Sequence, residues 1–507
     1  MGSGVFLSPD ETAVATSARD FGQNFTMRIE DKLLSEGPWL HPRSYVTQGS
    51  AMVPVGFLGL PAILGIVWKF LGDWGLALFV PLLAISAAYP LFRLLQRFGN
   101  FAAGIAVLVW MSFPTVILYA NRGLFPNLPA LCFFLWGLYF LSFKKSMRWM
   151  IAAGLCTGAA LAIRPTEIVW MLPWVWLVWQ VHDVKKTKTR STRQLVVAGI
   201  IAAVVPMLAL SVVAWRTYGT PFAVGYLLHD AGGSQVVVSS LPPVASSAVG
   251  CSSLSCTFHS IWPFGVHPRD VWFNFQSYVL IFLGPWFVLM LCAFAAYVSK
   301  RRSWKVLAVS AWTLVVLAIV YGEAIYQDHV GVNVISSGNS YLRYLVPLAG
   351  LAALSAAALA AWLGARLGKN KSSVVMAAVV MVLMLLGAWT ATSRDDENIF
   401  TTTLELQRYA HVRSVTLQDI RPQAIIVSDR SDKIFFPTFR VATPVPSFDL
   451  LRPLVTNAPI PTMLYATTLN QTQTAQWEAG GIGLQPIFNS ENETLYQMLP
   501  TSTSTSP

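Results

Sequence analysis

The chain has 507 residues, of which 54% are hydrophobic and only 12% are charged. Soluble domains carry roughly 25% charged residues, so this composition excludes an ordinary soluble protein and indicates a polytopic membrane protein. The formal net charge of +11 does not indicate a nucleic-acid partner, because the basic residues lie in short runs between apolar segments.

An acidic pair, Asp10 and Glu11, lies near the start of the chain, directly after Ser8 and Pro9. This order is typical of a helix start, in which Ser8 caps, Pro9 occupies the first turn and the acids meet the positive end of the helix. The same carboxylates suit a general base that takes a proton from an attacking hydroxyl or amine. The residues alone leave both interpretations open.

Apolar runs fill most of the chain after residue 50, and a helix that crosses a bilayer needs about 20 such residues. The runs lie at 52–70, 73–93, 100–120, 127–143, 149–163, 166–181, 195–215, 273–298, 305–326, 341–364 and 373–392. Counting from 73–93 predicts ten crossings, with both chain ends outside. In this count the first run, 52–70, does not cross the membrane. Its Pro54 and Pro61 suit a helix that lies along the outer interface. The competing interpretation makes this first run a true span.

The basic residues of the loops predict the orientation, since cytoplasmic loops carry the excess of Lys and Arg. One set of alternate loops holds 17 basic residues against a single acid, Asp183. The basic residues are Arg93, Arg97, Lys144, Lys145, Arg148, Lys185, Lys186, Lys188, Arg190, Arg193, Lys300, Arg301, Arg302, Lys305, Arg366, Lys369 and Lys371. The other set holds only Arg122, Arg164, Arg216 and Arg269, so we expect it to face away from the cytoplasm.

Three larger external regions follow from this orientation. The first, 1–72, is predicted to be an external catalytic segment with interfacial helices. The second is the external loop at 217–272, which lies within the predicted transmembrane domain, 73–392. Segment 393–507 contains predicted strands and a helix, which indicate a small α/β domain with a disordered end. The predicted strands lie at 424–427 and 440–442, and the helix lies at 402–412. Cys251 and Cys256 share the external loop and are predicted to form a disulfide.

Two arginines lie at the ends of apolar runs on the predicted outer side. Arg164 separates 149–163 from 166–181, and Arg343 lies near the start of 341–364. A cation among apolar residues is costly and indicates function, and Pro165 requires the backbone there to line protein or water. One Arg guanidinium can donate to two phosphate oxygens at once, so the two arginines suggest a phosphate clamp. The alternatives are that Arg164 reaches the lipid headgroups and that Arg343 only anchors a helix end.

Weaker candidates are predicted as possible substrate-binding residues. They are His41, Arg43, Arg122, Asn127, Tyr341 and Glu167, which is also a candidate ion-pair partner of Arg164. Asp328 and His329 form too small a group for a metal site, and the sequence holds no phosphate-binding loop, dinucleotide fingerprint or Cys/His cluster. No cofactor is predicted, and a divalent cation stays open.

Several of these segments, taken in order, resemble the GT-C glycosyltransferases, and within them the lipid A aminoarabinose transferase and the protein O-mannosyltransferases. Residues 9–12 are similar to the acidic motif of the first external loop in that fold, and 39–43 are similar to the segment that follows it. The run 52–70 corresponds to a helix along the outer surface. Residues 154–165 and 343–347 also resemble the family, and the resemblance covers about 1–365.

This resemblance implies an all-α polytopic fold of about ten transmembrane helices plus interfacial helices, with a small external α/β domain. It also implies an inverting glycosyltransferase of the plasma (inner) membrane, active on the extracytoplasmic face. The donor would be a polyprenyl-phosphate sugar, and the acceptor a glycan, lipid or protein. Asp10 would be the base, Glu11 would orient it, and Arg164 and Arg343 would hold the donor phosphate. The expected partners are this donor, the acceptor and membrane lipids, with no nucleic acid.

Three features depart from the family pattern. The family normally has a first span before the acidic loop, whereas this sequence starts at the loop. Met52 and Val53 replace a Lys often found ahead of the interfacial Pro, and Asn127 replaces an acid often seen in the second external turn. The alternative function is a lipid or solute transporter or flippase, in which Arg164 and Glu167 form a gating pair. Transporters usually contain internal repeats, and none is visible in the sequence.

Overall fold

The computed structural model describes residues 4–35, 37–143, 146–181, 190–226, 228, 267–298, 304–323, 335–457, 460–490 and 492–501. The chain divides into two compact units. Unit 1 comprises Met1–Asp73, Val212–Val249 and Thr403–Pro507, and unit 2 comprises Trp74–Ser211 and Gly250–Thr402. The two ends of the chain therefore belong to the same unit.

The N-terminal part of unit 1 begins with helix α1 (Pro9–Asn24), and its start is the one predicted from the sequence. The Ser8 side chain accepts a hydrogen bond from the Asp10 backbone at 3.1 Å, Pro9 occupies the first turn, and Asp10 and Glu11 follow. A small antiparallel sheet of order β1-β3-β2 comes next. Its strands are β1 (Ile29–Glu30), β2 (Tyr45–Gln48) and β3 (Ala51–Pro54), and the short 3-10 helix η1 (Lys32–Ser35) follows β1.

Helix α2 (Gly59–Ser86) begins later than the predicted interfacial helix at 52–70. That prediction was wrong for the start of the run, because Ala51–Pro54 is the central strand of the sheet and pairs with both β1 and β2. Gly72 interrupts α2 with a φ of 59°, a backbone conformation that glycine adopts without strain. Within unit 1, α2 packs closely on α1: a Cβ added at Gly65 would lie 2.6 Å from the carbonyl oxygen of Ala18.

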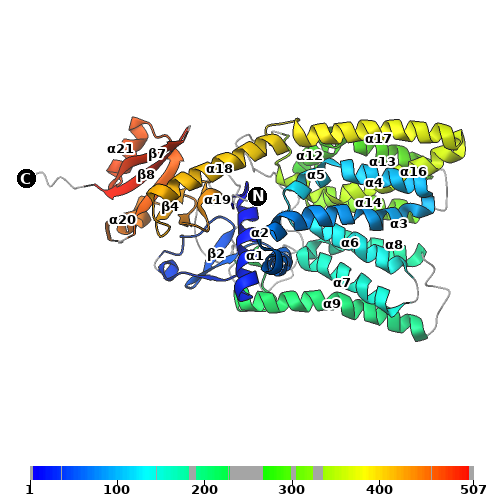
Figure 1. Ribbon diagram of the computed structural model, residues 1–507, viewed down its shortest axis with the longest axis horizontal. Coiled ribbons are helices and arrows are strands. Elements are labelled where there is room, and N and C mark those ends of the chain that lie inside the picture. The colour runs from blue at the N-terminus through cyan, green and yellow to red at the C-terminus, as the bar shows by residue number, and fades with distance from the viewer. Residues whose placement is uncertain are drawn as a thin grey trace, which may run out of the picture. The chain divides into compact units, whose positions relative to one another are not determined.

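The C-terminal part of unit 1 is the α/β domain predicted from the sequence. Its five-stranded sheet has the order β5-β4-β6-β8-β7, in which β4 is parallel to β5 and β6, and β8 is antiparallel to β6 and β7 (Figure 1). The elements are α18 (Ile399–Asp419), β4 (Ile425–Ser428), α19 (Asp432–Phe435), β5 (Arg440–Ala442), α20 (Phe448–Asn457), β6 (Thr462–Thr467), α21 (Gln471–Ala479), β7 (Ile482–Ser490) and β8 (Glu493–Pro500).

The two parts of unit 1 share one hydrophobic core, which the sequence did not predict. Tyr45 of the small sheet packs against Phe436 of the C-terminal domain, with ring centroids 5.2 Å apart. Arg43 pairs with Asp432, which is fully buried, and Arg440 pairs with Asp31 at 2.5 Å. These contacts fix the segment that carries Asp10 to the C-terminal domain.

Unit 2 is helical, and α16 packs against α4, α13 and α17 (Figure 1). The remaining elements are α3 (Ala88–Leu95), η2 (Gln96–Phe98), α4 (Asn100–Ser112), α5 (Pro114–Asn121), α6 (Asn127–Ser142), α7 (Met147–Ile163), η3 (Pro165–Glu167), α8 (Ile168–Val181), α9 (Arg190–Tyr218), α12 (Pro268–Asn274), the π-helical η5 (Phe275–Phe282), α13 (Gly284–Val298), α14 (Trp304–Val320), α15 (Ser340–Tyr344), α16 (Pro347–Leu367) and α17 (Lys369–Thr392).

Several of the apolar helices are long enough to cross a membrane. Among the described residues, four helices meet the length and hydropathy that a span requires, and the number rises to seven if each of three bent pairs is one span. The bends are 53° after Ser112, 118° after Ile163 and 90° after Phe282. Asn127–Ser142 and Trp304–Val320 are shorter apolar helices. The structure thus confirms a mostly helical protein with several apolar helices long enough to cross a membrane, and the predicted count of ten crossings stays a prediction.

Asp20 in α1 is a partly buried carboxylate of unit 1 that is expected to destabilise the fold at neutral pH. Its Oδ2 atom is buried and has no hydrogen-bond partner among the described residues. Burial raises the pKa of Asp20 from 3.8 to about 6, although Arg19 acts in the opposite direction. The folded state holds the proton of Asp20 more tightly than the unfolded state does. The stabilisation that this protonated carboxyl contributes is therefore complete below about pH 4 and is lost as the pH rises through 6.

We therefore expect Asp20→Asn to increase the free energy of unfolding at pH 7.5 by roughly 2–3 kcal/mol. The increase is measured as a higher unfolding temperature of the detergent-solubilised protein. The gain is expected to shrink at pH 4.5, where the wild-type carboxyl is protonated. Asp73→Asn is the matched control, since Asp73 is exposed and paired with Arg19, and its loss is expected to change stability by less than about 1 kcal/mol. An unfolding temperature for Asp20→Asn that is equal to wild type at both pH values would contradict the prediction.

Candidate functional site

A buried ion pair lies at the turn between α7 and α8 in unit 2. Arg164 is only 5% exposed, and its Nε donates to Oε1 of Glu167 at 2.6 Å. The indole nitrogen of Trp170 donates to the other carboxylate oxygen of Glu167. Pro165 ends α7 and opens the next turn, which places both charged side chains at the sharpest of the three bends. The predicted partnership of Arg164 with Glu167 is thus confirmed.

Two tyrosines cover this ion pair. The rings of Tyr321 and Tyr344 stack with centroids 4.6 Å apart and an interplanar angle of 10°. The Arg164 guanidinium lies over both rings, 5.8 Å from the centroid of Tyr321 and 5.1 Å from that of Tyr344. The Tyr321 hydroxyl also donates to Glu167 at 3.2 Å. Each favourable contact between a cation and a ring face contributes a further stabilisation that increases with desolvation.

Arg343 of the short helix α15 contacts one of these tyrosines, Tyr344, and a further aromatic residue, Phe125. Its guanidinium lies 5.4 Å from the ring centroid of Tyr344 and 5.0 Å from that of Phe125. Arg122 lies over the same Phe125 ring at 4.8 Å. The structure therefore brings together three of the predicted cations, although 179 positions in the sequence separate Arg164 from Arg343. We call Arg164, Glu167, Tyr321, Arg343 and Tyr344 the arginine cluster.

Acidic side chains hold the loop that leads into α15. Asp395 accepts hydrogen bonds from the backbone and hydroxyl of Ser337, at 2.9 and 2.6 Å. Glu397 accepts one from the backbone of Gly338 at 3.1 Å, and a Cβ at this glycine would lie 2.3 Å from the carboxylate. Asn339 then caps α15 through a bond from the Tyr341 backbone. These contacts position Arg343 without using its guanidinium.

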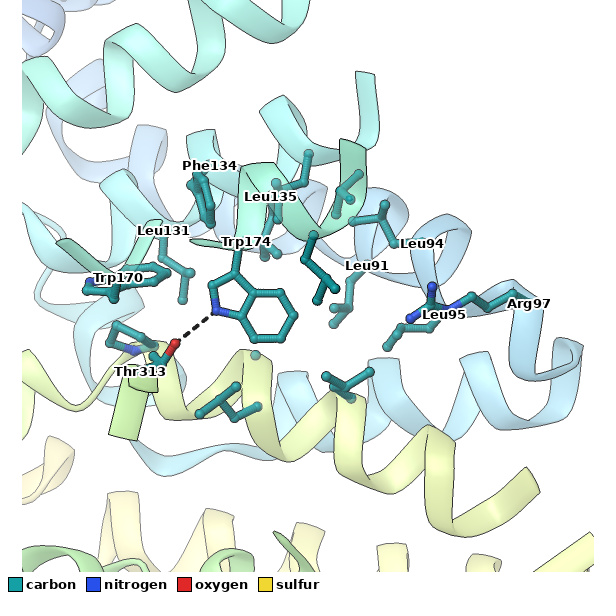
Figure 2. A pocket seen from close by; sticks show the side chains of 17 residues that line it. Leu91, Leu94, Leu95, Arg97, Leu131, Phe134, Leu135, Trp170, Trp174 and Thr313 are labelled. Atoms are coloured by element: carbon teal, nitrogen blue, oxygen red, sulfur yellow. Dashed lines mark hydrogen bonds between the residues drawn. The ribbon is translucent and has the colours of Figure 1, made fainter. Parts of the chain in front are cut away.

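An apolar groove in unit 2 has a cavity volume of about 100 Å³, or about 800 Å³ when the space open to solvent is included. Side chains of α3, α6, α8, α14 and α16 line it, and most of them are leucines and aromatic residues (Figure 2). Trp174 crosses the middle and donates a hydrogen bond to Thr313 at 2.9 Å. Figure 2 shows Trp170 at one end of the groove and Arg97 at the other.

The arginine cluster belongs to the Trp170 end of the groove. Trp170 lines the groove and donates its indole hydrogen to Glu167, so one side chain joins the apolar space to the ion pair. Pro347, which also lines the groove, follows Arg343 and Tyr344 by one turn. An elongated apolar groove with the arginine cluster next to one end can hold an apolar chain with an anionic head.

The acidic pair of the N-terminus lies in unit 1. Asp10 is exposed, and its Oδ1 accepts a hydrogen bond from the Ser44 hydroxyl at 2.8 Å, whereas Glu11 is buried. Ser44 directly follows Arg43, so the structure brings the acidic motif and the predicted 39–43 segment together. The Arg43 guanidinium donates to both Asp432 and the Arg430 carbonyl oxygen, which ties it to the C-terminal domain.

The other predicted residues fall in different places. The Nδ1 atom of His41 lies 3.0 Å from the carbonyl oxygen of Pro42. Tyr341 is buried, and its hydroxyl donates a hydrogen bond to the carbonyl oxygen of Leu317 at 3.4 Å. Cys251 and Cys256, and their predicted disulfide, lie outside the described residues. No group of three or more His, Cys, Asp and Glu side chains in the described ranges could hold a metal ion.

Sequence reasoning missed the aromatic half of the cluster. Tyr321, Tyr344 and Trp170 each contact Arg164 or Glu167, and Phe125 contacts Arg343. The available signal was weak, because aromatic residues near span ends usually belong to interfacial belts. Only Tyr344, adjacent to Arg343, lay beside a predicted residue.

Comparisons with known proteins bear on the fold. No protein-family model matches the chain, and no curated protein matches it significantly. Among solved structures, the chain is similar to ArnT from Cupriavidus metallidurans bound to undecaprenyl phosphate, with a TM-score of 0.57 and 13% identity. The similarity covers 97% of this chain and 94% of that chain. The protein therefore has a GT-C-like fold, as its sequence motifs predicted.

Proposed function

We propose that this protein is a membrane glycosyltransferase that transfers a sugar from a polyprenyl-phosphate donor to an acceptor outside the cytoplasm. The observation that carries the proposal is the apolar groove that ends at the arginine cluster, since it matches a long apolar chain with a phosphate head. The similar fold of ArnT, which was solved with undecaprenyl phosphate, supports this ligand class. The acceptor would be a glycan, a lipid or a protein.

The reaction assigns a role to each group. The acceptor hydroxyl or amine attacks the anomeric carbon of the donor sugar and gives its proton to Asp10, the general base. The bond between that carbon and the phosphate oxygen breaks, and polyprenyl phosphate leaves with the electron pair. Arg164 and Arg343 bind the phosphate and stabilise the charge that develops on it. Glu11 orients the base, and attack from the face opposite the phosphate inverts the anomeric centre.

The test of this function is the release of polyprenyl phosphate. Purified protein in native membrane lipids is incubated with polyprenyl-phosphate sugars labelled in the sugar, and both the free lipid phosphate and the labelled product are measured. A transferase converts donor to free polyprenyl phosphate with transfer of the label to an acceptor. A flippase or transporter would leave the donor intact, and unchanged donor for every sugar offered would overturn the proposal.

The proposed orientation has a direct test. The excess of basic residues in one set of loops predicts that the C-terminal domain is outside and that the start of α17 is inside. A cysteine at the exposed Gln471 is therefore expected to react with a membrane-impermeant thiol reagent in intact cells, and a cysteine at the exposed Lys371 only after permeabilisation. Labelling of Lys371→Cys alone in intact cells would reverse the assignment.

A further inference from the structure

Asn127 opens helix α6 with a buried side chain whose polar atoms are unsatisfied. The residue is 5% exposed, and neither the nitrogen nor the oxygen of its amide has a hydrogen-bond partner within the described part of the chain. Buried polar groups in native proteins are nearly always hydrogen-bonded, because an unsatisfied group loses its contacts with water and gains none. A residue that retains this cost indicates a partner that the described chain does not provide.

The position of Asn127 identifies where that partner lies. Side chains that are four, seven, eight and eleven positions apart share one face of a helix, and Leu131, Phe134, Leu135 and Leu138 of α6 all line the groove. Asn127 continues this stripe by one turn, about 5.4 Å beyond Leu131. In Figure 2, Leu131 is beside Trp170 and Leu135 is further along the groove, so the stripe leads toward the end that carries the arginine cluster.

The chemistry of an amide narrows the choice of partner. The Asn side chain offers two N–H donors and a carbonyl acceptor, and both kinds of atom are unsatisfied here. A phosphate dianion has only acceptors and would leave the amide oxygen without a partner, whereas a sugar hydroxyl both donates and accepts. Building on the proposed function, we infer that Asn127 hydrogen-bonds a hydroxyl of the donor sugar and selects a sugar without positive charge.

The charges around this end of the groove favour the binding of an uncharged sugar over that of a protonated amino sugar. Arg164 and Arg343 are cations, and the Glu167 carboxylate already accepts hydrogen bonds from Arg164, Trp170 and Tyr321. Glu323, two residues beyond Tyr321, accepts one from the backbone of His267. A protonated amino sugar would therefore meet cations and a neutral amide, and like charges in a poorly solvated site repel strongly.

Binding of three lipids to the full-length protein tests this inference. The lipids share one polyprenyl chain and carry a bare phosphate, a phospho-linked neutral hexose or a phospho-linked amino sugar. Their affinities are measured by native mass spectrometry for wild type, Asn127→Ala, Asn127→Asp and the control Asn121→Asp. Asn121 is exposed at the end of α5, and its amide donates to the Ile117 carbonyl oxygen, so the same substitution there lies away from the stripe.

The expected results are specific to sugar recognition. Wild type binds the hexose lipid more tightly than the amino-sugar lipid. Asn127→Ala weakens hexose-lipid binding about tenfold, the worth of one hydrogen bond of ordinary strength, and leaves the bare phosphate within twofold. Asn127→Asp shifts the preference toward the amino sugar, and Asn121→Asp changes nothing. The unfolding temperature of Asn127→Ala equals or exceeds that of wild type, because no native hydrogen bond is lost and the cost of the buried, unsatisfied amide is removed.

Other results overturn the inference. Equal weakening of all three lipids by Asn127→Ala would assign the amide to the phosphate, and unchanged affinities or a lowered unfolding temperature would make it structural. A wild-type preference for the amino-sugar lipid would also refute it. If the lipids bind but no donor is ever turned over, the transferase function fails while the affinity comparison still decides the role of Asn127. If none of the three lipids binds, both proposals fail.

Discussion

Asp10→Asn is expected to reduce turnover by about 10²–10⁴-fold, the usual contribution of a general base. The substitution keeps the size of the side chain and an oxygen that can accept the 2.8 Å hydrogen bond from Ser44, but it removes the proton acceptor. The start of α1 should survive, because Ser8 and not Asp10 provides the cap. Donor affinity should also persist, since Arg164 and Arg343 are the residues proposed to bind the phosphate.

Two further variants separate the base from its surroundings. Ser44→Ala removes the hydroxyl that bonds Asp10, so we expect a smaller loss of turnover that is accompanied by a changed pH profile. Glu11→Gln is expected to cost less than Asp10→Asn, because Glu11 only orients the base in the proposed mechanism. Measured turnover of Asp10→Asn within a few-fold of wild type, with donor binding intact, would remove Asp10 from the catalytic mechanism.

Arg164→Ala is expected to abolish measurable binding of the polyprenyl-phosphate donor and to destabilise the protein by about 3–5 kcal/mol. The stability loss arises because the buried Glu167 carboxylate would keep only the hydrogen bonds from Trp170 and Tyr321. Arg164→Lys retains the charge but not the planar fork, so it should bind donor with intermediate affinity. Affinity is measured with labelled donor, and stability by thermal unfolding in detergent.

A double variant decides whether Arg164 binds the donor or only neutralises Glu167. In Arg164→Met with Glu167→Gln, both charges are gone, and removal of a whole buried pair is often neutral for stability. We expect this variant to unfold near the wild-type temperature and still to fail in donor binding. Recovery of donor affinity together with stability would show that Arg164 is a structural ion-pair partner of Glu167.

Much of the fold could be predicted because it depends on neighbours in sequence. Composition alone indicated membrane helices, Ser8 and Pro9 indicated the start of α1, and Pro165 indicated the break between α7 and α8. The strand at Arg440–Ala442 was predicted to the residue. These features arise from hydropathy, capping and the fixed φ of proline, all of which act within a few residues.

Other features could not be read from local patterns. Residues 52–54 were taken into a helix although they belong to the central strand of a sheet. There, pairing with β1 and β2 overrides the local apolar pattern, as is common for strands. The shared core of the N-terminal and C-terminal parts of unit 1 belongs to the same class.

The candidate site shows the same division. By itself, the sequence determined that Arg164 and Arg343 are unusual, because a cation among apolar residues is costly wherever it lies. Only the tertiary structure decided that Tyr344 joins them, that Trp170 links Glu167 to the apolar groove, and that Asn127 continues the groove-lining stripe of α6. The reason is that these groups meet through the packing of α6, the turn between α7 and α8, and α15, and such packing is set by complementary surfaces rather than by the residues next to each group.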